Sequence, residues 1–261
     1  MGSLRLQSGK LSFDVFGNHH QETVFFCHSL GANRSLWNRQ TEHMSQKYKV
    51  VRIDLRGHGQ SDLFETPYSI KALASDIIVL LDFLKIQKCH FVGLSLGSMI
   101  GLWLAVNRPE RFNKMVLAGA SSNVREKKPF DERIASIRQK GLAPIMNQLN
   151  SRWYYSDFVS TNPNIVEKIN AMVTQTSVDG YIAATIAVRD FDLSAQLKKI
   201  STPILLITGS GDQATPLSEA EYIAAKSDKA TLSIVEGASH LAIIEKPSEF
   251  DGLLYDFLDN Q

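Results

Sequence analysis

Short apolar runs alternate with amphipathic segments over most of this chain. Runs with the length and composition of buried or half-buried strands occupy residues 10–16, 23–27, 49–53, 89–92, 115–118, 203–208 and 231–235. Between these runs apolar residues recur at helical spacing, and we expect helices at residues 37–44, 70–84, 96–106, 217–226 and 248–258. Such alternation predicts an α/β fold with a mostly parallel sheet that helices cover on both faces.

The pattern changes between residues 122 and 197, where helical periodicity dominates and no strand is expected. Short helices are expected there at residues 130–140, 142–150, 162–175 and 178–188. A helical insertion between strands of a parallel sheet is most simply a cap over the carboxyl edge of that sheet. We therefore expect a core formed by residues 1–121 and 198–261, with residues 122–197 as a helical cap.

Composition narrows the class of protein. The chain has 261 residues, of which 44% are hydrophobic and 21% are charged, and its formal net charge is +1. That charge gives no electrostatic reason to expect nucleic acid or an anionic membrane as a partner. No apolar segment approaches the roughly 18 residues of a membrane span, and the first residues lack the apolar region of a signal peptide. We expect a cytoplasmic protein.

The two cysteines fall in strands that are expected to be buried. Cys27 and Cys89 can form a disulfide only if these strands are neighbours, and two reduced, buried thiols are the simpler expectation in a cytosolic protein.

Residues 93–97, Gly-Leu-Ser-Leu-Gly, are the strongest chemical signal in the chain. They lie between the strand at 89–92 and the helix at 96–106, so Ser95 falls on a sharp strand-to-helix turn. This is the pattern of a nucleophile elbow, in which a strained turn exposes a serine hydroxyl. By itself the pattern also fits a tight turn with a solvated serine, so the interpretation depends on a base, an acid and an oxyanion loop elsewhere in the chain.

A base and an acid follow in the second part of the core. His240 lies just after the strand at 231–235 and Asp212 just after the strand at 203–208, so both are expected at the carboxyl edge of the sheet with Ser95. The order Ser, Asp, His is the order found in α/β-hydrolases. Asp62 is the alternative acid, and a turn-forming role is the alternative for Asp212. The other histidines are expected to be solvated or structural, with His58 shaping its glycine-rich loop.

An oxyanion hole needs two donors that face the reacting carbonyl oxygen. The backbone amide of Leu96 directly follows the nucleophile. Leu30, in the segment His28-Ser29-Leu30-Gly31 after the first core strand, is the expected second donor. The alternative for this segment is an ordinary strand-to-helix turn.

With these parts in order, the chain resembles the α/β-hydrolase superfamily over nearly its whole length, and within it the 3-oxoadipate enol-lactonases of aromatic catabolism. The resemblance rests on segments 28–31 with Trp37, 56–61, 93–97, 180–181 with 189–193, 212–216 and 240–241. His28 departs from the asparagine expected in many members. The resemblance implies a mostly parallel eight-stranded sheet flanked by helices, with a helical cap inserted after strand 6.

The resemblance also implies roles for named residues. Ser95 corresponds to the nucleophile, Asp212 to the orienting acid and His240 to the general base, without a metal or other cofactor. The enol-lactone substrate of the family is a small carboxylate anion, so the site is expected to hold a fixed cation. Arg189 is the first candidate and Arg34 the second, with Trp153 in an apolar wall. Pairing with Asp190 or Asp192 is the alternative role for Arg189.

Two other functions stay open at this point. A carboxylesterase, or a carbon–carbon bond hydrolase of ring-cleavage products, has the same core and differs in the residues that line the cap. A non-catalytic ligand-binding homologue is a third possibility, although such proteins commonly lose a catalytic residue and none is missing here. A metal site is not expected, because His19, His20 and the acidic residues lack ligand spacing.

Overall fold

The computed structural model describes residues 1–155 and 157–259. Its centre is an eight-stranded sheet with the order β1-β2-β4-β3-β5-β6-β7-β8. The strands are β1 (Gly2–Leu6), β2 (Gly9–Phe16), β3 (Thr23–Cys27), β4 (Lys49–Asp54), β5 (Cys89–Leu94), β6 (Phe112–Ala118), β7 (Ile204–Gly209) and β8 (Ala230–Val235). All seven strands expected from the sequence are present within a few residues of their expected bounds.

Strands β3 to β8 pair in parallel, whereas β1 and β2 join the sheet in antiparallel pairs. Strand β1 was not expected from the sequence. It has five residues of which only Leu4 is buried, so its apolar pattern is too short to detect. Its existence depends on pairing with β2, with Leu4 opposite Leu11.

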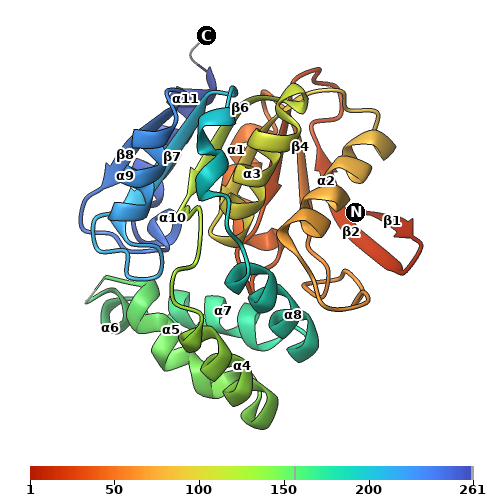
Figure 1. The fold of residues 1–261 in the computed structure, drawn as a ribbon. Helices are drawn as coiled ribbons and strands as arrows, with labels where there is room; N and C mark the ends of the chain where they lie inside the picture. Colours follow the sequence, from red (N-terminus) through yellow and green to blue (C-terminus); the bar gives the residue numbers. More distant parts are fainter. Residues whose placement is uncertain (156, 260–261) are drawn as a thin grey trace.

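Helices cover both faces of the sheet, as expected. On one face α2 (Ile70–Phe83), α3 (Leu96–Asn107) and α9 (Leu217–Lys226) pack on one hydrophobic core cluster. On the other face α1 (Asn38–Met44) and α11 (Pro247–Asp259), with the short α10 (Ala242–Glu245), pack on a second (Figure 1). Successive residues of a strand point to opposite faces of the sheet, and here both faces are covered. The parallel strands are therefore almost continuously apolar. Short 3-10 helices lie at Arg34–Trp37, Pro109–Arg111, Ala143–Ile145 and Ser194–Lys199.

A helical cap is inserted between β6 and β7. Its helices are α4 (Lys128–Lys140), α5 (Met146–Trp153), α6 (Phe158–Thr161), α7 (Pro163–Thr174) and α8 (Val178–Arg189). They lie together beyond one edge of the sheet (Figure 1). Residues such as Ile137, Leu149 and Tyr181 give the cap a hydrophobic cluster of its own. Helix α6 was not expected, since one turn carries too little periodicity to be detected.

The two cysteines are buried free thiols. They do lie on neighbouring strands, but Cys27 is opposite Gly93, four residues from Cys89. The register therefore keeps them apart, and the disulfide alternative is excluded in this structure. In the part of the chain that the structure describes, no helix has the combined length and apolar character needed to cross a bilayer.

Candidate active site

Ser95 occupies a strained turn between β5 and α3. Its φ of 54° and ψ of −110° lie outside the regions that a residue with a side chain normally adopts. The Ser95 amide donates a hydrogen bond of 2.8 Å to the carbonyl of Ala118 on the neighbouring strand. The turn is thus held by the sheet, and it presents the Ser95 side chain to a cavity at the carboxyl edge.

Gly93 and Gly97 make this turn sterically possible. A Cβ atom at Gly97 would lie 2.3 Å from the carbonyl oxygen of Cys27, and one at Gly93 would lie 2.5 Å from the carbonyl carbon of Gly97. Both neighbours are backbone atoms that cannot rotate away. Gly97 is therefore required by the contact between the turn and the end of strand β3, and Gly93 by the contact with the first residues of α3.

Asp212 and His240 are hydrogen-bonded on adjacent loops. Asp212 follows β7, His240 follows β8, and His240 Nδ1 lies 2.8 Å from Asp212 Oδ2. Thr215 Oγ1 donates to the same Asp212 oxygen at 2.9 Å and lies 3.2 Å from His240 Nδ1. The second Asp212 oxygen accepts the amides of Ala214 and Thr215, both at 2.8 Å. These contacts fix Asp212 as the group that orients the imidazole.

Asp212 remains ionised in this buried position. Burial alone would raise the pKa of its carboxyl group. The charge of His240, together with the hydrogen bonds from His240 and Thr215, outweighs burial and lowers that pKa below its usual value. Asp62, the alternative acid, is exposed and accepts the amide of Lys10 instead.

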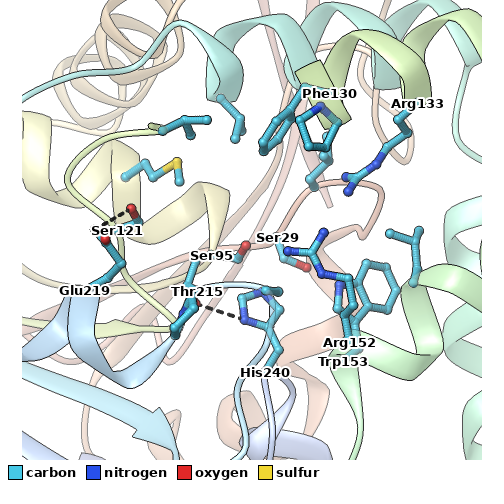
Figure 2. A pocket seen from close by; sticks show the side chains of 18 of the residues that line it. Ser29, Ser95, Ser121, Phe130, Arg133, Arg152, Trp153, Thr215, Glu219 and His240 are labelled. Atoms are coloured by element: carbon cyan, nitrogen blue, oxygen red, sulfur yellow. Dashed lines mark hydrogen bonds between the residues drawn. The ribbon is translucent and has the colours of Figure 1, made fainter. Parts of the chain in front are cut away.

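Ser95 and His240 approach each other across the end of β6. The imidazole lies against Gly119, where a Cβ would be 2.8 Å from His240 Cε1, and the preceding Ala118 holds the Ser95 amide. Figure 2 shows both side chains in the same cavity. Within the described residues, no direct hydrogen bond joins the Ser95 hydroxyl to His240. Catalytic hydrogen bonds in ligand-free sites are commonly long, and they tighten in the complex with substrate.

Two amides close to the nucleophile in the chain or in the cavity have no protein acceptor among the described residues. They belong to Leu96, at the first position of α3, and Leu30, in the loop after β3. Leu30, Ser29 and Ser95 line the same cavity. An oxyanion formed on a Ser95 adduct has donors available from both segments.

The cavity has a volume of about 540 Å³ and is bounded by core and cap. Such a volume suits a small organic substrate. Figure 2 shows Arg133 and Arg152 on one side of Ser95, and Ser121 with Glu219 on the other. Trp153, Phe130 and Val188 supply apolar wall. Trp153, which is expected in an apolar wall of the substrate site, is among these lining residues.

Arg133 and Arg152 are cations without a carboxylate partner among the described residues. Arg152 donates to the carbonyl of Gln213 at 2.9 Å, and Arg133 lies 5.3 Å from the centre of the Phe130 ring. Burial and then the charge of Arg133 lower the pKa of Arg152, against the opposing effect of Asp212. The two guanidinium groups therefore place positive charge on one side of the cavity, whose lining also includes Glu126 and the Arg125–Glu219 ion pair.

The structure does not bring Arg189 or Arg34 to the cavity, and the expected substrate contacts are wrong for both. Arg189 is not among the residues that line the cavity, and it forms ion pairs of 2.7 Å with Asp131 and Asp190. Arg34 is buried beneath the oxyanion loop, where it pairs with Asp14 and Asp54. In both cases neighbouring acidic residues already satisfy the charge.

Sequence reasoning missed Thr215, Arg133, Arg152 and Tyr181. Thr215 lies three residues after Asp212, in the segment 212–216 that contributes to the resemblance, but the sequence suggested no role for it. The two arginines lie on α4 and α5, and their direction depends on how the cap packs. Tyr181 is fully buried, lines the cavity and lies near Arg133. Burial raises the pKa of its hydroxyl, and the adjacent Arg133 side chain opposes that shift.

The comparisons with known proteins agree with this fold. The sequence profile of the alpha/beta hydrolase fold matches residues 22–247. The chain belongs to the α/β-hydrolase family. It is 35% identical to 3-oxoadipate enol-lactonase 2 of Acinetobacter baylyi, over 95% of this hydrolase and 93% of that protein. It is also 31% identical to a Pseudomonas syringae protein named for carbamate hydrolysis, RutD, over 92% of this chain and 94% of that one.

Solved structures show the same relationship. The enol-lactonase of Burkholderia xenovorans superposes on this hydrolase with a TM-score of 0.95 at 27% identity, covering 99% of this chain and 100% of that one. The expected fold, with its mostly parallel sheet and a helical cap after strand 6, is thereby confirmed.

Proposed function

We propose that this hydrolase opens a carboxylated enol-lactone, 3-oxoadipate enol-lactone in the first instance, with Ser95 as nucleophile, His240 as base and Asp212 as orienting acid. The observation that carries the proposal is the buried bond between Asp212 and His240, beside a serine held on a strained turn. The similarity to enol-lactonases supports the substrate class.

The reaction follows from the positions of these groups. Ser95 Oγ attacks the lactone carbonyl while its proton passes to His240 Nε2, and the amides of Leu30 and Leu96 bind the resulting oxyanion. Collapse breaks the ring C–O bond, and the leaving enol oxygen takes the proton from His240. The enol then becomes a ketone. Water gives a proton to His240, attacks the acyl-enzyme and releases the carboxylate product and free Ser95.

The substrate carboxylate is assigned to the arginine side of the cavity. Arg133 and Arg152 replace Arg189 and Arg34 as the expected cations, because they face the cavity and have no carboxylate partner among the described residues. A carboxylate between them would accept charge-assisted hydrogen bonds. The buried hydroxyl of Tyr181 lies beside Arg133 and is available as a further donor.

In this proposal residues 122–197 form the substrate-binding cap, and residues 1–121 and 198–261 form the catalytic core. A neutral carboxylic ester would leave the positive charge of Arg133 and Arg152 without a counter-charge. The arginine pair therefore favours an anionic substrate over a neutral ester, and the similarity to enol-lactonases favours the carboxylated lactone among the anionic substrates.

A substrate panel and one variant test the proposal. Wild-type protein is expected to open carboxylated enol-lactones faster than neutral esters, carbamates or ring-fission products. Ser95→Ala should abolish turnover and leave the circular dichroism spectrum and melting temperature unchanged. Full activity in Ser95→Ala would refute the proposed role of Ser95 as the nucleophile. Faster turnover of a neutral ester would refute the substrate class.

A further inference from the structure

Glu245 joins the cap to the loop that carries His240. Its carboxylate accepts the backbone amide of Ser239 at 2.6 Å and the backbone amide of Tyr155 at 2.6 Å. Ser239 directly precedes His240, and Tyr155 follows the last residues of α5. One side chain at the end of α10 therefore connects the base to the cap.

Further contacts join the same two segments, the cap segment 152–155 and the base loop 236–241. The Leu241 amide donates to the Trp153 carbonyl at 3.0 Å, and the Ser239 hydroxyl lies 3.2 Å from the Arg152 carbonyl. These are direct bonds between the two segments. Glu245 differs because it lies outside both segments and its one carboxylate binds a backbone amide of each.

The chemistry of the contact requires a carboxylate. An ionised Glu245 has only acceptors and can receive both amide hydrogens at once. A glutamine can accept with one oxygen, but its NH₂ group would face the other amide as donor against donor. The pKa of Glu245 is raised overall, because burial, together with the charge of Asp212, outweighs the opposing effect of the two amides and Lys246.

We infer that Glu245 is a positioning residue, which holds His240 in register with Ser95 and keeps the cap segment 152–155 on the core. The inference rests on the proposed roles of Ser95 and His240. Arg152 lies in the same segment, so Glu245 links the position of the base to that of a substrate-binding cation. Loss of the carboxylate should then affect chemistry and substrate binding together.

The experiment compares Glu245→Gln and Glu245→Ala with wild type. Ser95 reactivity is measured as the rate constant for labelling by a fluorophosphonate, which needs the triad but not the lactone. We expect labelling and kcat to fall together, on the order of 10-fold for Glu245→Gln and 100-fold for Glu245→Ala, since a shift of about 1 Å has such effects. KM for a carboxylated lactone should rise more than KM for a neutral ester.

Glu249→Gln is the matched control, because Glu249 is an exposed carboxylate four residues further on, and it should match wild type. A lower melting temperature with wild-type labelling and kcat in both Glu245 variants would overturn the inference and leave only a structural role. Slower labelling in these variants, in a protein that opens no lactone, would support the positioning role and refute the proposed substrate. Wild-type protein that does not label at Ser95 would overturn both.

Discussion

His58 Nε2 accepts the backbone amide of Gly31 at 3.1 Å, directly beside the proposed oxyanion donor Leu30. His58 Nδ1 lies 2.9 Å from the carbonyl of Arg56, so that nitrogen carries the hydrogen and Nε2 is free to accept. His28 is held in the same way, between the Leu55 amide and the Ser29 carbonyl. Two neutral, buried histidines thus support the loop that carries Leu30. The sequence predicted that His58 shapes its own glycine-rich loop, and its bond to Gly31 was not predicted.

Replacing His58 should weaken catalysis, because the loop that carries Leu30 loses a hydrogen bond. His58→Leu keeps a similar side-chain volume but leaves the Gly31 amide without an acceptor, at a cost of about 1–3 kcal/mol in unfolding free energy. We expect kcat to fall roughly 10-fold as the Leu30 amide shifts, since loss of an oxyanion donor costs about 100-fold or more. Urea unfolding and steady-state kinetics measure both effects, with the exposed His43→Gln as control. Unchanged kcat in a less stable His58→Leu would contradict the role in the loop.

The same histidines predict loss of stability in acid. Burial lowers the pKa of His28 to about 4 and that of His58 to about 3. In the unfolded chain both bind protons below about pH 6.5. The unfolded state therefore holds more protons between pH 6.5 and 4, and unfolding free energy decreases as pH falls, by up to about 1.4 kcal/mol per pH unit for each histidine. The slope should be shallower in His58→Leu, and equal slopes would count against this explanation.

Two glycine substitutions should have opposite effects. Gly97→Ala places a Cβ against the Cys27 carbonyl, so we expect it to unfold the protein or displace Ser95 and remove activity. Gly252→Ala meets no atom within 4 Å and lies within α11, so it should raise unfolding free energy by about 0.8–1.0 kcal/mol. Thermal unfolding and fluorophosphonate labelling distinguish the two. An active, stable Gly97→Ala would show that the close approach is not required.

The cavity arginines should control affinity for the carboxylate. Arg133→Ala should raise KM for a carboxylated lactone by roughly 10-fold, since a hydrogen bond to a charged group is worth about 1.5–3 kcal/mol. KM for a neutral ester should change little. Arg189→Ala removes a guanidinium that is paired outside the cavity, and it should leave both KM values unchanged. A larger rise of KM for the carboxylated lactone in Arg189→Ala than in Arg133→Ala would show that Arg189 binds the carboxylate.

Thr215 should help to keep the pKa of Asp212, the proposed acid of the triad, low. Thr215→Val removes a hydroxyl that donates to Asp212 Oδ2 at 2.9 Å, so the pKa of Asp212 should rise. We expect kcat to fall by up to about 10-fold, because the bond is worth about 1.5 kcal/mol or more. Ser121→Ala is the control on the far side of the cavity. A kcat equal to wild type across the pH range would show that the amides of Ala214 and Thr215 suffice.

Much of the fold and of the candidate triad follows from local sequence. Period-two and period-3.6 patterns locate the strands and helices, and steric limits around Ser95 specify where glycine must stand. The order of the elements then places Ser95, Asp212 and His240 at one sheet edge, because parallel strands share their carboxyl ends.

Tertiary structure alone decided three features. These are strand β1, the arginines that line the cavity, and the hydrogen bonds of Glu245 to the cap and the base loop. Leu4 carries too little pattern to predict a strand without its partner. The sequence places Arg133, Arg152 and Arg189 all in the expected cap, but it does not say which of them lines the cavity with Ser95. That direction depends on how α4, α5 and α8 pack, and on whether an acidic residue such as Asp131 or Asp190 is within reach. Long-range packing sets the direction of each arginine and the distance to its acidic neighbours, and no local residue spacing predicts either.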